Sequence, residues 1–164
     1  MIIDANVFKG YFESTMTSKH SLSRCPVSLF AQFSAATPIY HDAGKIIESE
    51  WQHVVDREWF EPWLATQLME GAIAYVETVR DMELEKKLTA AGFPVGRDIV
   101  YVRVGLGVVR LKGTGCTLFT EDMDFYDPTQ KKCASKTRTK LLAAASGPVC
   151  KILKKRGITV SSVP

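Results

Sequence analysis

Two groups of acidic residues follow short apolar runs, and acids in that position can hold a divalent cation. Asp4 comes directly after Ile2-Ile3, and Asp122 lies in Thr120-Glu121-Asp122-Met123-Asp124, which follows Thr117-Leu118-Phe119. In an open parallel sheet, ligands bind beyond the carboxyl ends of the strands. If the two strands are neighbours, the carboxylates meet in one pocket, where they either raise a pKa or bind a cation such as Mg²⁺. Such an ion can activate a water for attack on a phosphodiester.

The pattern around these acids alternates strands with helices, which predicts a parallel α/β sheet with helices on both faces. Strands are expected at residues 1–4, 72–76, 116–120 and 158–160. Helices are expected over residues 5–13, after Pro26, and over 46–55, 60–70, 79–91 and 141–153, the last with a break at Gly147-Pro148. Residues 41–44 form a turn-like cluster, and 14–24 a polar connection.

The segment DIVYVRVGLGVVRL, residues 98–111, is ambiguous. Propensity alone favours a strand, because Val and Ile dominate the segment and its two glycines weaken a helix.

Composition predicts one soluble globular domain over residues 1–164. The chain is 46% hydrophobic and 24% charged, which excludes a disordered chain, a collagen-like repeat and a disulfide-stapled miniprotein. No apolar run reaches the ~18 residues of a membrane span, and the N-terminal residues lack a signal-peptide pattern. The four cysteines form no CxxC pair, so we expect free thiols and a cytoplasmic protein.

Charge is distributed unevenly along the chain. Residues 128–164 hold nine basic side chains and no acid, whereas residues 1–127 carry a net charge of −6, within an overall +3. A basic C-terminal segment on an acidic body suits contact with a phosphate backbone or an acidic partner. A lysine-rich solvated helix face explains the same pattern, and the sequence leaves both interpretations open.

Three segments resemble the PIN-domain nuclease family. The start, residues 2–8, is similar to that family's opening strand, in which Asp-x-Asn follows a hydrophobic pair. Residues 118–125 are similar to its late strand and turn, and residues 42–51 resemble the helix that supplies its glutamate. The order of the segments and the overall length also match, and the resemblance covers nearly the whole chain.

The resemblance implies a three-layer α/β/α sandwich with a central, mostly parallel sheet. It also implies cleavage of RNA, and less often of DNA flaps, with Mg²⁺ or Mn²⁺. Carried over residue by residue, the metal ligands and catalytic acids would be Asp4, Glu50, Asp98 and Asp122. Residues 98–111 would then form a buried helix, which departs from their propensity.

Further roles follow from the same resemblance. Asn6 would hold the first aspartate or a metal-bound water, Thr120 would steady the fourth acid, and Asp124 could supplement it. Glu48 competes with Glu50, and the Glu-aromatic pattern before Trp51 favours Glu50. The residues expected along an RNA backbone are Lys131, Lys132, Lys136, Arg138 and Lys140. A stand-alone nuclease of this kind resembles the toxins of bacterial toxin–antitoxin pairs, so an antitoxin or other operon-encoded partner is expected; self-association stays open.

Each acid also has a purely structural interpretation. Asp4 and Asp98 could cap helices, and Asp122, Asp124 and Asp127 could form Asx turns. Two other functions stay open. A phosphotransfer domain would need Asp-x-Asp after the first strand, where position 6 is Asn. In a non-catalytic RNA- or protein-binding module, the acids would be caps and the basic segment would do the binding.

Overall fold

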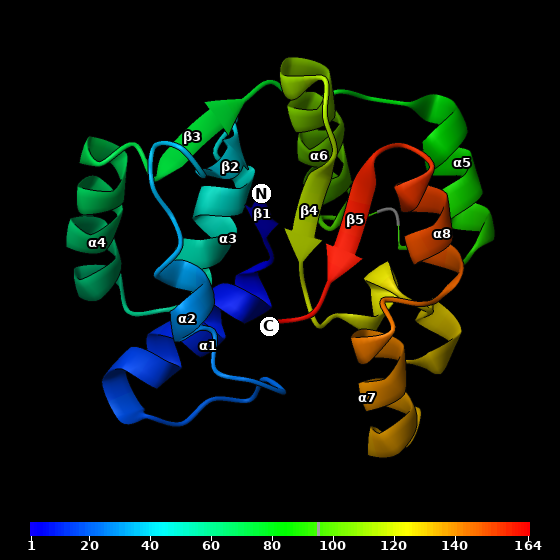
Figure 1. Ribbon diagram of the computed structural model, residues 1–164, viewed down its shortest axis with the longest axis horizontal. Helices are drawn as coiled ribbons and strands as arrows, with labels where there is room; N and C mark the ends of the chain where they lie inside the picture. The colour runs from blue at the N-terminus through cyan, green and yellow to red at the C-terminus, as the bar shows by residue number, and fades with distance from the viewer. Residues whose placement is uncertain (95) are drawn as a thin grey trace.

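Five parallel strands form the centre of the molecule. The computed structural model describes residues 1–94 and 96–164. The strands are β1 (Ile2–Ile3), β2 (Ile39–Asp42), β3 (Ile73–Val76), β4 (Cys116–Phe119) and β5 (Ile158–Ser161). β4 pairs with β1 and β5, and β2 pairs with β3. The amide of Tyr40 donates to the Met1 carbonyl at 2.8 Å, so β2 also lies beside β1, and the spatial order is β3-β2-β1-β4-β5 (Figure 1).

Helices connect the strands, as the alternating pattern predicts. Their bounds are α1 (Ala5–Thr17), α2 (Val27–Phe30), α3 (Ile46–Val54), α4 (Arg57–Met69), α5 (Met82–Ala90), α6 (Ile99–Lys112), α7 (Ser135–Ala143) and α8 (Pro148–Lys154), with short 3₁₀ turns η1 (Met123–Phe125) and η2 (Pro128–Gln130). The fold is therefore mixed α/β on a parallel sheet. No helix in the described part of the chain is long and apolar enough to cross a membrane.

The turn expected at residues 41–44 is wrong in part. His41 and Asp42 belong to β2, a strand missing from the predicted set, and all of its residues are buried; a strand buried on both faces loses the polar–apolar alternation that would identify it. The break expected at Gly147-Pro148 is confirmed, because it divides α7 from α8, although α7 begins earlier than expected, at Ser135. Gly147 separates them with φ of 152°, and a Cβ there would overlap the Tyr126 carbonyl.

The segment for which propensity favours a strand is helix α6, and the strand prediction is wrong. Eight of its residues are buried, and it contacts all five strands, so burial outweighs the preference of Val and Ile for strands. Its glycines permit the close approach. A Cβ on Gly105 would lie 2.7 Å from Ile158 Cδ1, and one on Gly107 would overlap the Glu77 carbonyl.

An aromatic core fixes the start of α1. Trp51 of α3 and Phe8 of α1 are fully buried, and their rings stack with centroids 3.9 Å apart. The Trp51 indole N–H also donates to the Ile3 carbonyl at 3.3 Å. These contacts hold the end of β1, and therefore Asp4, against α3.

Candidate carboxylate site

The strand order places the first and last acidic motifs side by side. β1 and β4 are neighbours with Ile3 opposite Phe119, and the Asp4 amide continues the ladder by donating to the Phe119 carbonyl at 3.0 Å. The chain runs outward from β1 to β2 and β3 on one side, and β4 and β5 lie on the other. This is a topological switch point, where open α/β sheets bind ligands.

Asp4 is linked directly to the motif after β4. It is 6% exposed, and the Thr120 hydroxyl donates to its Oδ2 at 2.6 Å. The same hydroxyl oxygen accepts from the Asp122 amide at 2.9 Å. Thr120 was expected to steady the fourth acid; its hydroxyl instead holds the carboxylate of the first acid and reaches Asp122 only through the backbone.

Asp4 also serves as the N-cap of α1, since its Oδ1 accepts from the Asn6 amide at 3.4 Å. The capping interpretation is therefore correct for Asp4, and it does not remove the residue from the site. The pKa of Asp4 is raised to about 7, mainly by burial and to a smaller extent by the nearby charges of Asp122 and Asp98. The hydrogen bond from Thr120 acts in the opposite direction and lowers it. A plain surface cap would stay ionised with an ordinary pKa.

Asp98 is the N-cap residue of α6. Among the described residues, its side chain accepts no capping hydrogen bond from the helix. Partial burial raises its pKa to about 6, and the charges of Asp122, Asp124 and Glu50 add to this effect. The sequence alone left a capping role open for Asp98. The structure instead places its carboxylate within electrostatic reach of three other acids.

Glu50 and Glu48 point to different neighbours. The Tyr101 hydroxyl donates to Glu50 Oε2 at 2.7 Å and accepts from the Ala5 amide at 3.2 Å, next to Asp4. Glu48 instead accepts from the Tyr75 hydroxyl and pairs with Lys45 at 3.4 Å. Of the two glutamates, Glu50 is therefore the one placed beside the aspartates. Tyr101, which sequence reasoning missed, connects α6, α3 and α1; no polar pattern in its buried helix marked it.

The turn after β4 holds two further aspartates. Asp122 accepts from the Asp124 amide at 2.9 Å, so it does form the turn contact that its type favours. Asp124 is 4% exposed, and Lys131 Nζ lies 2.7 Å from its Oδ2. Its Oδ1 is buried without a hydrogen-bond partner among the described residues.

A cavity of about 480 Å³ opens beside this turn. Of the candidate acids, Asp122 and Asp124 line it, whereas Asp4, Glu50 and Asp98 are not among its lining residues. Its lining residues are Asn6, Ser21, Leu22, Glu121, Asp122, Met123, Asp124, Lys131 and Arg138. Asn6 is exposed at the cavity wall. Its backbone amide contacts Asp4, and the role expected of its side chain stays a prediction.

Glu121, which the sequence analysis left without a role, shapes two walls of this cavity. Its buried carboxylate accepts from the Ser23 amide at 3.0 Å and from the Ser23 hydroxyl. Its backbone carbonyl accepts from the Arg138 guanidinium. Because Ser23 is 98 positions away in the sequence, no local pattern could have shown that Glu121 anchors residues 21–23.

The five basic residues expected to contact RNA divide into two groups. Lys131 and Arg138 line the cavity, where each already has a partner within the protein. Lys132, Lys136 and Lys140 are exposed, the last two on α7. All five therefore lie between the end of η2 and the end of α7, and Lys131 and Arg138 are the two that line the cavity.

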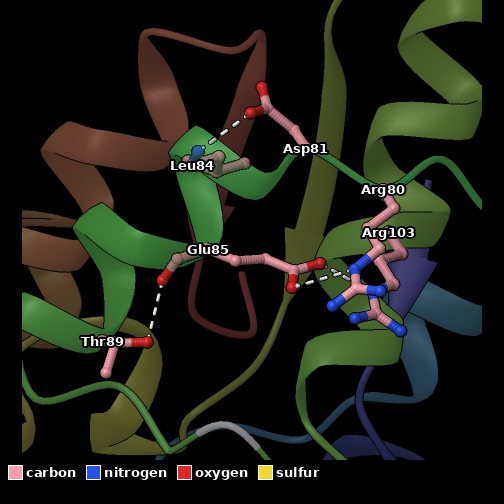
Figure 2. A network of polar contacts seen from close by, with 6 residues as sticks. All are labelled: Arg80, Asp81, Leu84, Glu85, Thr89 and Arg103. Atoms are coloured by element: carbon pink, nitrogen blue, oxygen red, sulfur yellow. Dashed lines mark hydrogen bonds and ion pairs between the residues drawn. The ribbon is translucent and has the colours of Figure 1, made fainter.

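A second network contains another buried acid, Glu85 of α5 (Figure 2). Glu85 is 8% exposed, and its two carboxylate oxygens face Arg103 Nε at 2.9 Å and Arg80 Nε at 3.4 Å. The hydrogen bond from Arg103 lowers the pKa of Glu85, against a smaller effect of burial. Asp81 caps α5 next to this contact by accepting from the Leu84 amide at 2.9 Å.

The carboxylates near Asp4 do not form a ready metal centre. Within residues 1–94 and 96–164, no group of three or more His, Cys, Asp or Glu side chains is arranged so that it could hold a metal ion. Comparison of the chain with protein-family models, with curated proteins and with solved structures finds no match in any of the three.

Proposed function

We propose that this protein is a metal-dependent endoribonuclease with the three-layer α/β/α architecture of PIN domains. One observation supports the proposal: Asp4, Asp98 and Asp122 lie within electrostatic reach of one another, and Tyr101 joins Glu50 to the residue after Asp4. Burial and mutual repulsion raise the pKa of Asp4 to about 7 and that of Asp98 to about 6. Clusters of this kind are uncommon outside functional sites.

The chemistry of the donor set fits a hard divalent cation. The donors are carboxylate oxygens, which Mg²⁺ and Mn²⁺ prefer, and Asp124 adds a buried oxygen with no partner among the described residues. Since no three acids in the described ranges are arranged to hold a metal, the proposal requires the side chains of Asp98 and Asp122 to draw toward Asp4 when the ion binds. Relief of the repulsion among the acids favours that movement.

Each residue then has a defined task. Asp4, Glu50, Asp98 and Asp122 would hold the cation, which would supply an activated water and neutralise charge on the phosphate. Thr120 fixes the orientation of Asp4 through its 2.6 Å hydrogen bond, and Tyr101 does the same for Glu50 at 2.7 Å. Such supporting contacts set the direction in which a ligand oxygen points.

The basic segment supplies affinity for the backbone. Lys132, Lys136 and Lys140 are exposed on the same segment as Lys131 and Arg138, which line the cavity, and exposed cations bind phosphates without reading the bases. Binding should therefore weaken steeply with salt. A single-stranded loop is the expected target, because its backbone can enter an open cleft. A partner protein of the antitoxin type, with a basic side chain entering the acidic cavity, would block the same site.

The test is cleavage of a labelled mixed RNA pool with Mg²⁺, with Mn²⁺ and with EDTA. We expect metal-dependent cleavage that falls by about 100-fold or more in the double variant Asp4→Asn/Asp122→Asn, because several kcal/mol of charge stabilisation is lost. Near-UV circular dichroism checks that the variant is folded.

A matched pair on α3 provides the control. Glu50→Gln should lose activity, whereas Glu48→Gln, which changes a glutamate directed at Tyr75 and Lys45, should retain it. Salt-sensitive RNA binding that is unchanged in the double variant, with no cleavage under any metal, would replace the nuclease proposal with a non-catalytic binding module.

A further inference from the structure

Two arginines share the buried carboxylate of Glu85. Arg103 of α6 and Arg80, which lies just before α5, both approach this carboxylate through their Nε atoms, at 2.9 Å and 3.4 Å. The Val79 amide donates to the Arg103 carbonyl at 3.1 Å, so the backbone next to Arg80 is fixed to the residue that carries the other arginine. Figure 2 shows both guanidinium groups at the same carboxylate.

Each guanidinium group keeps its outer edge available for another anion. A guanidinium has five N–H donors in a planar fork, and Glu85 meets the Nε donor of each arginine. Among the described residues, no hydrogen bond starts from the Nη atoms of either side chain. The exposed fractions of the side chains are 61% for Arg80 and 29% for Arg103, so both are open to solvent.

The pair carries more positive charge than Glu85 compensates. Two guanidinium groups meet one carboxylate, and +2 with −1 leaves a net charge of +1 at this point. The neighbouring acid Asp81 is engaged elsewhere, because it accepts from the Leu84 amide at 2.9 Å and pairs with Arg156 at 3.1 Å. A phosphodiester group carries a single negative charge, and guanidinium forks suit its two unesterified oxygens.

A hollow of about 610 Å³ adjoins the pair. Val79, which precedes Arg80, and Gly107, one helical turn after Arg103, belong to its lining. The other lining residues are Tyr75, Val76, Glu77, Thr78, Arg110 and Leu111. Glu77 supplies a negative charge, and the apolar and aromatic side chains supply walls that a nucleobase can contact.

A second cation lies on the far side of this hollow. Arg110 is seven positions after Arg103, which places both on one face of α6, about 10.5 Å apart along the helix axis. Arg110 is exposed and lines the hollow. Cations repeated along one helix face suit the regularly repeated charges of a nucleic-acid backbone.

We propose that Arg80 and Arg103 form an arginine clamp for one phosphodiester group of single-stranded RNA, and that Glu85 is the residue that positions the clamp. The next nucleotide lies in the hollow, on the way to Arg110. The choice of RNA as the ligand rests on the proposed function. The arginine clamp itself needs neither the carboxylates near Asp4 nor a metal ion.

The first test measures RNA binding in EDTA, where neither metal nor cleavage contributes. Fluorescence anisotropy follows a labelled single-stranded RNA of mixed sequence with the wild type, Arg80→Gln and Arg57→Gln. Arg57→Gln is the matched control, because Arg57 of α4 also meets one carboxylate through Nε, 2.7 Å from Glu61. Arg80→Gln leaves Glu85 paired with Arg103, so this variant should stay folded.

Arg80→Gln should weaken RNA binding by about 10-fold at low salt. It should also reduce the slope of log K against log salt by about 0.7, the contribution of one phosphate in a single strand. Arg57→Gln should bind RNA as the wild type does. Equal affinities of Arg80→Gln and Arg57→Gln for RNA would overturn the proposal.

A labelled oligoglutamate of the same net charge is the second probe in this test. The arginine clamp predicts that Arg80→Gln weakens the binding of RNA more than that of oligoglutamate. If Arg80→Gln weakens only the binding of oligoglutamate, the site takes an acidic peptide and the assignment to phosphate is wrong.

The second test asks whether Glu85 positions the arginines. Glu85→Gln removes a negative charge close to the bound RNA, so a purely electrostatic contribution of the arginines predicts tighter binding. A positioning role predicts weaker binding although the net charge rises, because the two guanidinium groups are no longer held together. Near-UV circular dichroism checks that the variant is folded. Tighter RNA binding by folded Glu85→Gln would refute the positioning role.

The arginine clamp and the proposed nuclease fail separately. RNA binding that depends on Arg80, without cleavage by the wild type under any metal, would support the clamp and refute the nuclease. Metal-dependent cleavage by the wild type, together with unchanged RNA binding by Arg80→Gln, would do the reverse.

Discussion

Glu85 and Asp4 are equally buried acids in opposite electrostatic situations. Glu85 is 8% exposed and Asp4 is 6% exposed. Two arginines face Glu85, and the Arg103 hydrogen bond lowers its pKa. Asp4 is surrounded instead by a hydroxyl group and by other acids, and burial raises its pKa to about 7. Burial is the largest cause of the shift at Asp4, whereas at Glu85 the Arg103 hydrogen bond outweighs burial and reverses the direction of the shift.

Glu85 therefore stabilises the fold, whereas the acids around Asp4 destabilise it. Glu85 joins α5 to Arg103 of α6 and to Arg80 (Figure 2), so its charge contributes to packing. The acids around Asp4 repel one another, and their charges oppose folding. Residues retained at a cost in stability indicate a function that needs them.

The largest effect on stability is expected at Glu85. Glu85→Ala should lower the free energy of unfolding by about 2–3 kcal/mol, because Arg103 would be left partly buried without its partner. Urea denaturation measures the change. Replacing both Glu85 and Arg103 by Met should cost less than Glu85→Ala, since no unpaired charge remains. An unchanged urea midpoint in Glu85→Ala would contradict the claim that Glu85, unlike Asp4, stabilises the fold.

Asp4→Asn should act in the opposite direction. The unfolded carboxyl releases its proton near 3.8, while the folded one keeps it until about 7. The wild type therefore loses stability as pH rises between these values and carries the full penalty above pH 7. Asparagine can still cap α1 and accept from Thr120 without a charge. The stability gained by the substitution should thus be about 2 kcal/mol larger at pH 8 than at pH 5.

Urea denaturation in EDTA at both pH values checks this difference. His41, whose pKa burial lowers to about 4, weakens both proteins alike as pH falls below 6.5 and cancels in the comparison. A gain that is equal at both pH values, or larger at pH 5, would contradict the electrostatic account of Asp4.

The smallest effect is expected at Arg57, which isolates the role of burial. Arg57 Nε lies 2.7 Å from Glu61, about as close as Arg103 Nε lies to Glu85, but the exposed fractions of the side chains are 76% and 56%. Arg57→Gln should change the free energy of unfolding by less than about 0.5 kcal/mol. A loss as large as that in Glu85→Ala would show that burial does not strengthen such pairs here.

Much of the sheet could be predicted from the sequence because its signals are local. Ile2-Ile3 and residues 116–120 are apolar runs with clear ends, so the strands and the acids that follow them could be recognised. The interior of the fold was harder. Helix α6 contradicts the propensity of its own residues, and only the family resemblance predicted it; the contacts of Gly105 and Gly107 that explain it come from distant segments.

For the candidate site, too, the residues with local signals could be predicted and the contacts between distant segments could not. The positions of Asp4 and Asp122 follow from strand ends, and the expected Glu-aromatic pattern selected Glu50, the glutamate found next to Tyr101. The contact between Lys131 and Asp124 was not predictable, because it depends on how η1 and η2 fold back. In the sequence, Lys131 is one of nine basic residues on a C-terminal segment without acids.

The 116 positions between Asp4 and Thr120 bear on when the site can exist during synthesis. β1 leaves the ribosome first, yet β4, which completes its pairing, and Lys131 follow only in the last third of the chain. Contacts so distant in sequence form late. A nascent chain therefore cannot form the contact between Asp4 and Thr120, or the β1–β4 pairing beside it, until β4 has been synthesised.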